Sequence, residues 1–282
     1  MQLIKYFKCL KEENIEMRMI VIFTALFFCI EAFAGDFEDG VAAYNQKDFA
    51  TALAKFRSAA QMGNRDAQYL VGEIYEEGRG VKQDYKEAIK WYRLSAQQGN
   101  VAAQLGLGQI YSQGKGVKTD NKEAFHWFQL AAKQGQAVAQ QVLGMLYYNG
   151  IGIAQNYKEA AHWYKSAAEQ GDAESQHQLG GMYYLGQGVA QDYKEAVRWF
   201  QLAAQQGDAN AQLNLGGMYM AGQGVLQDYT RAHMWFNIAA IAGDKDSVKN
   251  RDIAASKMTA QQIEQAQRMA RECMASNYTK CD

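Results

Sequence analysis

The cysteine, histidine and serine side chains are the ones in this 282-residue chain that could do chemistry, and their spacing argues against it. No Cys-x-x-Cys or His-Glu-x-x-His pattern occurs, and His126, His162, His177 and His233 lie too far apart in sequence to suggest a local metal site. No serine stands in a Gly-x-Ser-x-Gly or Ser-x-x-Lys context suited to a nucleophile. We therefore expect no catalytic residue, no metal and no cofactor, in a protein that is not an enzyme.

A Gly-x-Gly segment, which can cradle a phosphate, recurs five times, as in Gly114-Lys115-Gly116-Val117. A dinucleotide or P-loop fingerprint needs a strand before the turn and further glycines or Gly-Lys-Ser/Thr after it. Here a helical pattern precedes each copy. The segments are therefore predicted to end helices, with the valine pinning the loop.

The elements that carry these loops follow a period of 36 residues, read from Phe49, Tyr85, Asn121, Tyr157, Tyr193 and Tyr229. After each of these residues comes a stripe of apolar side chains at helical spacing. Asp84 and Glu87 predict a capping box at one such start, and Gly99 and Asn100 predict the end of that helix and the cap of the next. Glycines recur in the middle of the helix that follows this cap, as at Gly108, and predict a neighbouring helix backbone too close for a Cβ.

The composition is that of an ordered, water-soluble protein, with 48% apolar and 21% charged residues and no proline. With 29 basic and 30 acidic residues the formal charge is −1, so no overall attraction to phosphates exists. Nucleic acid is not an expected partner.

The N-terminus has the pattern of a secretory signal peptide over residues 1–34. The apolar run Ile20 to Ile30 is too short to span a bilayer, and Ala32-Phe33-Ala34 predicts cleavage before Gly35. Residues 1–16 make a poor charged region, so a true start at Met17 is an alternative. Cleavage would leave Cys273 and Cys281 as an even pair in an oxidising compartment, which predicts a disulfide between them. Two reduced thiols at a frayed end are the alternative.

The motif Ala-Gln-x-x-Leu-Gly-x-x-Tyr, then Gly-x-Gly-Val, then Asp-Tyr-Lys-Glu-Ala-x-x-Trp resembles the Sel-1-like repeat, a relative of the tetratricopeptide repeat. The resemblance implies an all-α fold, an α-solenoid of two-helix repeats wound as a right-handed superhelix. It implies an N-terminal tetratricopeptide-like hairpin at 35–64 and C-terminal capping helices and a tail at 245–282. The five repeats within 65–244 would run 65–100, 101–136, 137–172, 173–208 and 209–244.

By analogy with tetratricopeptide repeats, the first helix of each repeat would line a concave binding face. This face starts acidic and becomes polar and aromatic, which favours a groove for an extended peptide with a basic end; the alternative is a solvated charged face. The candidate binding residues are Tyr69, Glu73, Glu76, Glu77, Gln109, Gln141, Tyr148, His177, Tyr184 and Met220.

The resemblance implies an exported scaffold or adaptor, periplasmic or secreted by a bacterium, that binds a protein or peptide and has no membrane span in its mature chain. We expect a monomer. A β-lactamase-like or penicillin-binding activity, described for cysteine-rich relatives, is the alternative. Those relatives carry a cysteine pair within each repeat, and this chain has none there.

Overall fold

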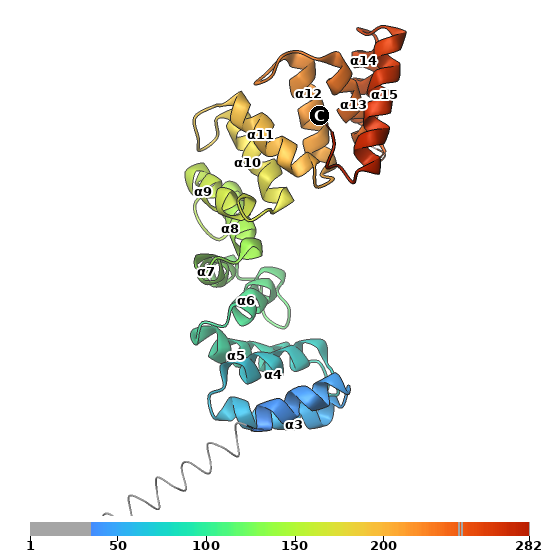
Figure 1. Cartoon of the computed structure of the whole chain (residues 1–282). Coiled ribbons are helices and arrows are strands. Elements are labelled where there is room, and N and C mark those ends of the chain that lie inside the picture. The colour runs from blue at the N-terminus through green and yellow to red at the C-terminus, as the bar shows by residue number, and fades with distance from the viewer. Residues whose placement is uncertain (1–34, 242, 244, 282) are drawn as a thin grey trace, which may run out of the picture. The chain divides into compact units, whose positions relative to one another are not determined.

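A computed structural model describes residues 35–241, 243 and 245–281, and all regular structure in these ranges is helical. The predicted signal peptide lies outside the described residues. Residues 35–45 are helical. The helices that follow (Figure 1) are α3 (Phe49–Gln61), α4 (Arg65–Glu77), α5 (Tyr85–Gln97), α6 (Val101–Gln113), α7 (Asn121–Lys133), α8 (Ala137–Asn149), α9 (Tyr157–Ala168), α10 (Ala173–Leu185), α11 (Tyr193–Ala204), α12 (Ala209–Ala221), α13 (Tyr229–Ala240), α14 (Lys245–Ala255) and α15 (Ala260–Ala275).

The chain divides into two compact units, unit 1 up to Thr119 and unit 2 from Asp120 onward. In unit 1, α3 packs on α4, α4 on α5 and α5 on α6. In unit 2, each helix from α7 to α13 packs on its successor in the same way. Packing between sequence neighbours defines a solenoid, so the predicted all-α solenoid of two-helix repeats is confirmed. None of the helices in the described ranges has the length and apolar character that a bilayer crossing requires.

Each second helix of a repeat begins at an acidic or amide cap. Asp84 accepts hydrogen bonds from the backbone N–H groups of Lys86 and Glu87, and Asp120, Asn156 and Asp192 do the same one, two and three repeats later. The return bond predicted for Glu87 is not formed. Its carboxylate lies 3.5 Å from Lys90 instead, because a cation one turn further on attracts it more strongly than a neutral amide does.

The helix ends follow the glycines as predicted. Gly99 has a φ of +83°, and the Asn100 side chain accepts from the N–H of Ala103 at the start of α6. A tryptophan recurs at the 36-residue period in the second helices, and Trp91, Trp127, Trp199 and Trp235 are buried in the core.

The glycines in the middle of the first helices face aromatic rings, and the predicted close backbone was wrong. A Cβ on Gly72 would lie 2.5 Å from the ring of Tyr92 in the next helix. The missing side chain leaves a notch in the helix surface that the ring fills. Equivalent notches are filled by Tyr164 at Gly144, by Phe200 at Gly180 and by Phe236 at Gly216. A ring inserted into the notch buries more apolar surface than a backbone contact would.

A buried glutamine ties each repeat to the helix before it. Gln176 Nε2 donates to the carbonyl of Ala168 at 3.1 Å, and Gln206 donates in turn to Gln176 Oε1 at 2.8 Å. The bond to a preceding alanine carbonyl recurs at Gln68, Gln104, Gln140 and Gln212. These bonds satisfy a polar group that would otherwise be costly to bury.

The second glycine of each Gly-x-Gly loop in unit 2 lies against the start of the second helix of the preceding repeat. A Cβ on Gly188 would lie 2.2 Å from the carbonyl oxygen of Tyr157, and Gly152 and Gly224 make equivalent contacts. Val189, which follows, is half-buried against the apolar core. The predicted role of these loops as helix ends is therefore confirmed, and a valine pins the loop at Val189, whereas the equivalent Ile153 is exposed.

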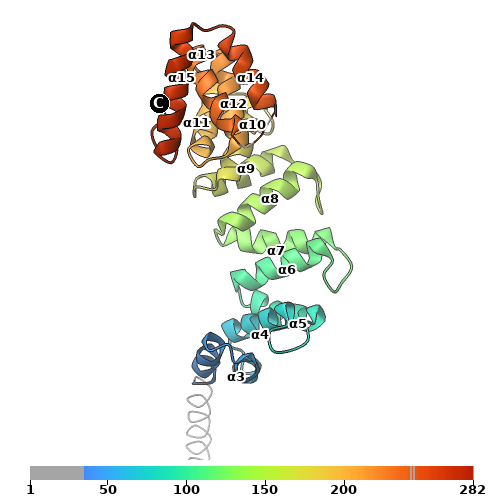
Figure 2. The same ribbon diagram turned by 90° about the vertical axis from the view of Figure 1, so that its right-hand side faces the viewer.

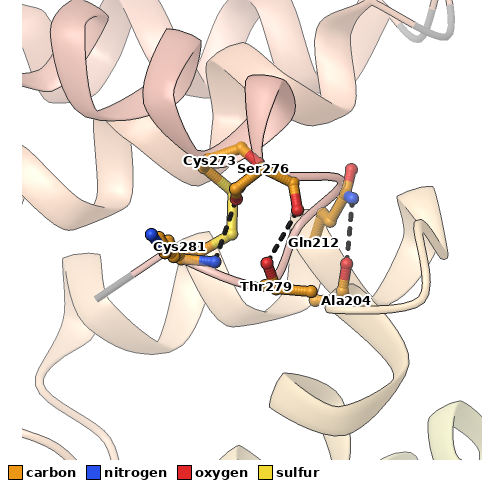
Figure 3. Close-up of a disulfide and its surroundings, with 7 residues drawn as sticks. Ala204, Gln212, Cys273, Ser276, Thr279 and Cys281 are labelled. Atoms are coloured by element: carbon orange, nitrogen blue, oxygen red, sulfur yellow. Dashed lines mark hydrogen bonds between the residues drawn. A yellow bond between two sulfur atoms is a disulfide. The ribbon is translucent and has the colours of Figure 1, made fainter.

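The C-terminal helices α14 and α15 pack on α13, the last helix of the repeats (Figure 2). Cys273 near the end of α15 faces Cys281, with the Sγ atoms 1.96 Å apart (Figure 3). Ser276 Oγ donates to the carbonyl of Cys273, and Thr279 Oγ1 donates to that of Ser276. The fold thus brings the two cysteines together, and their oxidation in the protein stays a prediction.

His233 of α13 should make the stability of unit 2 pH-dependent. Its side chain is 3% exposed, and burial and the nearby Arg251 lower its pKa below the usual 6.5, although Asp252 acts in the opposite direction. Protons therefore bind more readily to the unfolded chain. The contribution of neutral His233 is complete above pH 6.5 and falls as the pH drops below it. Urea midpoints at pH 7.5 and pH 5.5 should differ more for the wild type than for His233→Gln, whereas the exposed His162→Gln should behave as the wild type. Equal pH sensitivity in all three proteins would exclude His233 as the cause.

Candidate functional site

Five of the predicted binding residues meet in one recess of unit 1. Tyr69, Glu73, Glu76 and Glu77 project from α4 and Gln109 from α6, and together they line a cavity of about 640 Å³. Their positions follow from helical spacing, because residues three and four apart share one face of α4. We call this cavity the acidic recess.

Tyrosine hydroxyls hold two of its carboxylates in place. Glu73 accepts from Tyr69 at 3.1 Å and from Tyr44 at 3.0 Å, and Glu76 accepts from Tyr92 at 2.7 Å. The rings of Tyr69 and Tyr92 stack with their centroids 5.7 Å apart. The recess thus combines fixed acceptor oxygens with an aromatic wall.

The electrostatics of the recess are dominated by negative charge, since three glutamates and one lysine, Lys115, line it. Burial and the neighbouring Glu73 and Glu76 raise the pKa of Glu77 above its usual 4.5. Glu77 also forms an ion pair with Arg79, but that pair is exposed at the surface and does not outweigh the desolvation and repulsion. Burial and the glutamates likewise raise the pKa of Tyr69 and of Tyr92. A cation entering the recess would relieve this repulsion.

A second recess of about 610 Å³ lies in unit 2 between α10, α12 and α14. Of the predicted residues only Tyr184 lines it, together with Leu185 and Leu213. Its lining includes Gly181 and Gly217, each directly after a glycine that faces a ring. Nothing lies within 4 Å of a Cβ built on either residue, so the packing of unit 2 does not require glycine there. We call this cavity the glycine recess.

The other predicted residues of unit 2 lie elsewhere on the first helices. Tyr148 donates to Gln187 Oε1 at 3.0 Å and packs edge-on against Tyr157. Gln141 is half-buried on α8, and Met220 packs against the C-terminal core. His177 Nε2 lies 3.1 Å from Asn214 Nδ2.

Sequence reasoning missed Tyr92, which lines the acidic recess, and Tyr44, which donates to Glu73. Tyr92 falls in the apolar stripe of α5 and is 2% exposed, which is the pattern of a core residue. The sequence contained a signal that could have identified Tyr92 as part of the recess. Of the equivalent positions, 128, 200 and 236 hold phenylalanine and only 164 holds tyrosine, so the hydroxyl of Tyr92 is not needed for packing alone.

Comparisons with known proteins agree with this geometry. The model of the Sel1 repeat matches residues 65–100, 101–136, 137–172, 173–208 and 209–244. The chain is similar to a protective antigen of uropathogenic Escherichia coli strains that displays this fold, with 31% identity over 87% of this chain and a TM-score of 0.70. It spans 55% of that antigen's length.

A Sel1 repeat protein from Oxalobacter formigenes is also similar, with 36% identity, a TM-score of 0.68, and coverage of 74% of this chain and 86% of that one. None of the curated proteins compared with the chain is a significant match.

Proposed function

Because the chain belongs to the Sel1 repeat family, we propose that it is an exported adaptor that binds a protein or peptide partner along the first helices of its repeats. Sel1-repeat proteins generally mediate protein–protein interactions, and the fold is typically a non-enzymatic scaffold. The β-lactamase-like alternative finds no support among the described residues. Export rests on the signal-peptide pattern of residues 1–34 and on the cysteine pair at the C-terminus.

The acidic recess is the observation that carries this proposal. Glu73 and Glu76 are held by tyrosines before any partner arrives, so their oxygens need little reorganisation to receive a cation. The stacked rings of Tyr69 and Tyr92 offer an apolar wall to the methylene stem of a lysine or arginine side chain. We infer that a basic side chain of the partner binds here.

The glycine recess would receive another part of the partner in unit 2. Glycine in a helix costs about 1 kcal/mol relative to alanine. At Gly181 and Gly217 no described neighbour would contact a Cβ, so packing does not explain why glycine is present there. Both glycines leave room above the helix backbone, between Tyr184 and Leu213, for an apolar side chain.

Labelled peptides with a central lysine or arginine test the acidic recess. The Glu73→Gln/Glu76→Gln double variant keeps one acceptor oxygen in each side chain and removes both charges. Affinity for these peptides should fall about tenfold or more, because a hydrogen bond to a charged group is worth about 1.5–3 kcal/mol. Fluorescence anisotropy at two salt concentrations measures this, since an electrostatic contact weakens as salt rises.

The control for this experiment is Glu87→Gln, which removes one charge from a residue that does not line the acidic recess and that pairs with Lys90. Tyr92→Phe gives a second comparison, because it keeps the ring and removes the hydroxyl that orients Glu76. We expect Glu87→Gln to bind as the wild type and Tyr92→Phe to lose part of the affinity. An equal loss in Glu87→Gln would show a non-specific charge effect and reject the acidic recess as the binding site.

A further inference from the structure

Three side chains of unit 2 bring metal-ligating atoms close together. Glu174 and His177 project from α10, and Asp208 is the N-cap of α12. One ring nitrogen of His177 and one oxygen of each carboxylate all lie within 4.8 Å of one another. His177 and Asp208 are half-buried, and Glu174 is exposed. The set mixes an imidazole with two carboxylates, so it is more than an acidic surface cluster.

The equivalent position in unit 1 shows what is unusual here. There, Asn100 Nδ2 donates to Asp66 Oδ1 at 3.0 Å. Three repeats later the same two positions hold Glu174 and Asp208, so the amide donor is replaced by a second carboxylate. Two like charges at this separation repel each other.

Within the described part of the chain, no lysine or arginine offsets this repulsion by an ion pair. Glu174 accepts a hydrogen bond from Gln178 Nε2 at 2.7 Å, and Asp208 accepts from the backbone N–H of Ala211 at 2.6 Å. Both of these donors are neutral. A bound cation would balance the negative charge of the pair.

The His177 ring has a nitrogen without a hydrogen-bond partner. Its Nε2 lies 3.1 Å from Asn214 Nδ2, while its Nδ1 is shielded from solvent and has no hydrogen-bond partner among the described residues. Buried polar atoms without partners are rare, and a bound ion is one explanation. The equivalent positions hold Tyr69, Leu105, Gln141 and Leu213, so the repeat itself does not require histidine at this place.

We propose that Glu174, His177 and Asp208 bind a divalent metal ion of the zinc class. A mixed nitrogen and oxygen donor set suits zinc, whereas calcium and magnesium prefer oxygen donors alone. Bonds of about 2.0–2.2 Å place the ligand atoms of tetrahedral zinc about 3.5 Å apart. The donors must therefore draw together by about an ångström, which the exposed side chain of Glu174 can supply by a rotamer change.

Three protein ligands leave a fourth coordination position for water or for a side chain of the partner. Asn214, which contacts His177, also lines the glycine recess. The metal would therefore sit at the border of the surface proposed for the partner. The site stands on its own, however, since binding of zinc alone requires no peptide.

Titration of the untagged, purified chain with Zn²⁺ alone, by calorimetry or by competition with a colorimetric chelator, tests the proposal. We expect one equivalent of zinc per chain, lost in His177→Ala and weakened about tenfold or more in Glu174→Gln. Asp208→Asn should also weaken binding, and it should fold normally because Asn64 and Asn100 cap equivalent helices.

The matched controls are His126→Ala and His162→Ala, which remove exposed histidines from α7 and α9. Both should bind zinc as the wild type does. Zinc uptake that is unchanged in His177→Ala, or no uptake by the wild type at pH 7.5, would overturn the proposal. Circular dichroism of each variant checks that the helices are intact, and either result leaves the peptide experiment at the acidic recess unaffected.

Discussion

Phe236→Ala should destabilise the protein by about 3–5 kcal/mol, the range expected when a fully buried phenylalanine is truncated. The ring is 0% exposed and lies against Gly216, so its removal leaves a cavity between α12 and α13. Urea unfolding followed by circular dichroism measures the loss. Leu226→Ala is the control, because Leu226 is 90% exposed and should cost less than about 0.5 kcal/mol.

A double-mutant cycle tests whether the contact between the Phe236 ring and Gly216 causes this loss of stability. Gly216→Ala alone should be destabilising, since its Cβ would lie 2.8 Å from the ring of Phe236. In the Phe236→Ala background the same methyl group enters the cavity and should cost nothing. The coupling between the two changes should then be about 1–2 kcal/mol. Additive effects would mean that the ring and the glycine do not depend on each other.

Gly188→Ala should be almost as damaging, with an expected loss of about 3 kcal/mol. Gly188 has a φ of +72°, a conformation that costs other residues about 1–2 kcal/mol. Its Cβ would also lie 2.2 Å from the carbonyl oxygen of Tyr157, and overpacking of this kind costs about 1–3 kcal/mol. The backbone carbonyl cannot rotate away as a side chain could, so we expect a lower urea midpoint.

Gly181→Ala is the matched control for that change, because it makes the same substitution in the middle of α10 with no atom within 4 Å of the new Cβ. It should stabilise the protein by about 0.5–1 kcal/mol. It should also narrow the glycine recess and weaken binding of a partner there. A destabilising Gly181→Ala would contradict the view that this glycine is kept for the recess and not for packing.

The neighbouring glycines of α10 and α12 therefore have different physical roles. Gly180 and Gly216 receive aromatic rings from the following helices, whereas Gly181 and Gly217 face open space in the glycine recess. The glycines that receive rings support the fold. The glycines that face open space lower stability, but they keep the surface of the glycine recess open. A binding protein is expected to carry such positions where its partner is bound.

The 36-residue period by itself determined the helices and their ends, because caps, apolar stripes and helix-ending glycines depend on residues close in sequence. It also determined which side chains share a face of α4, since helical spacing places Tyr69, Glu73 and Glu76 together. The family resemblance rested on the same local pattern. These features could be read without coordinates.

Only the tertiary structure decided which side chains meet across helices. It placed the hydroxyl of Tyr92 on Glu76, filled the glycine notches with rings instead of backbone, and brought Asp208 to Glu174 and His177. Such contacts depend on the separation and rotation of the packed helices. A repeating sequence pattern does not fix the resulting distances between side chains to better than several ångströms. The apolar stripe of α5 shows that Tyr92 points inward. That its hydroxyl oxygen reaches the acidic recess follows only from how α4 and α5 pack.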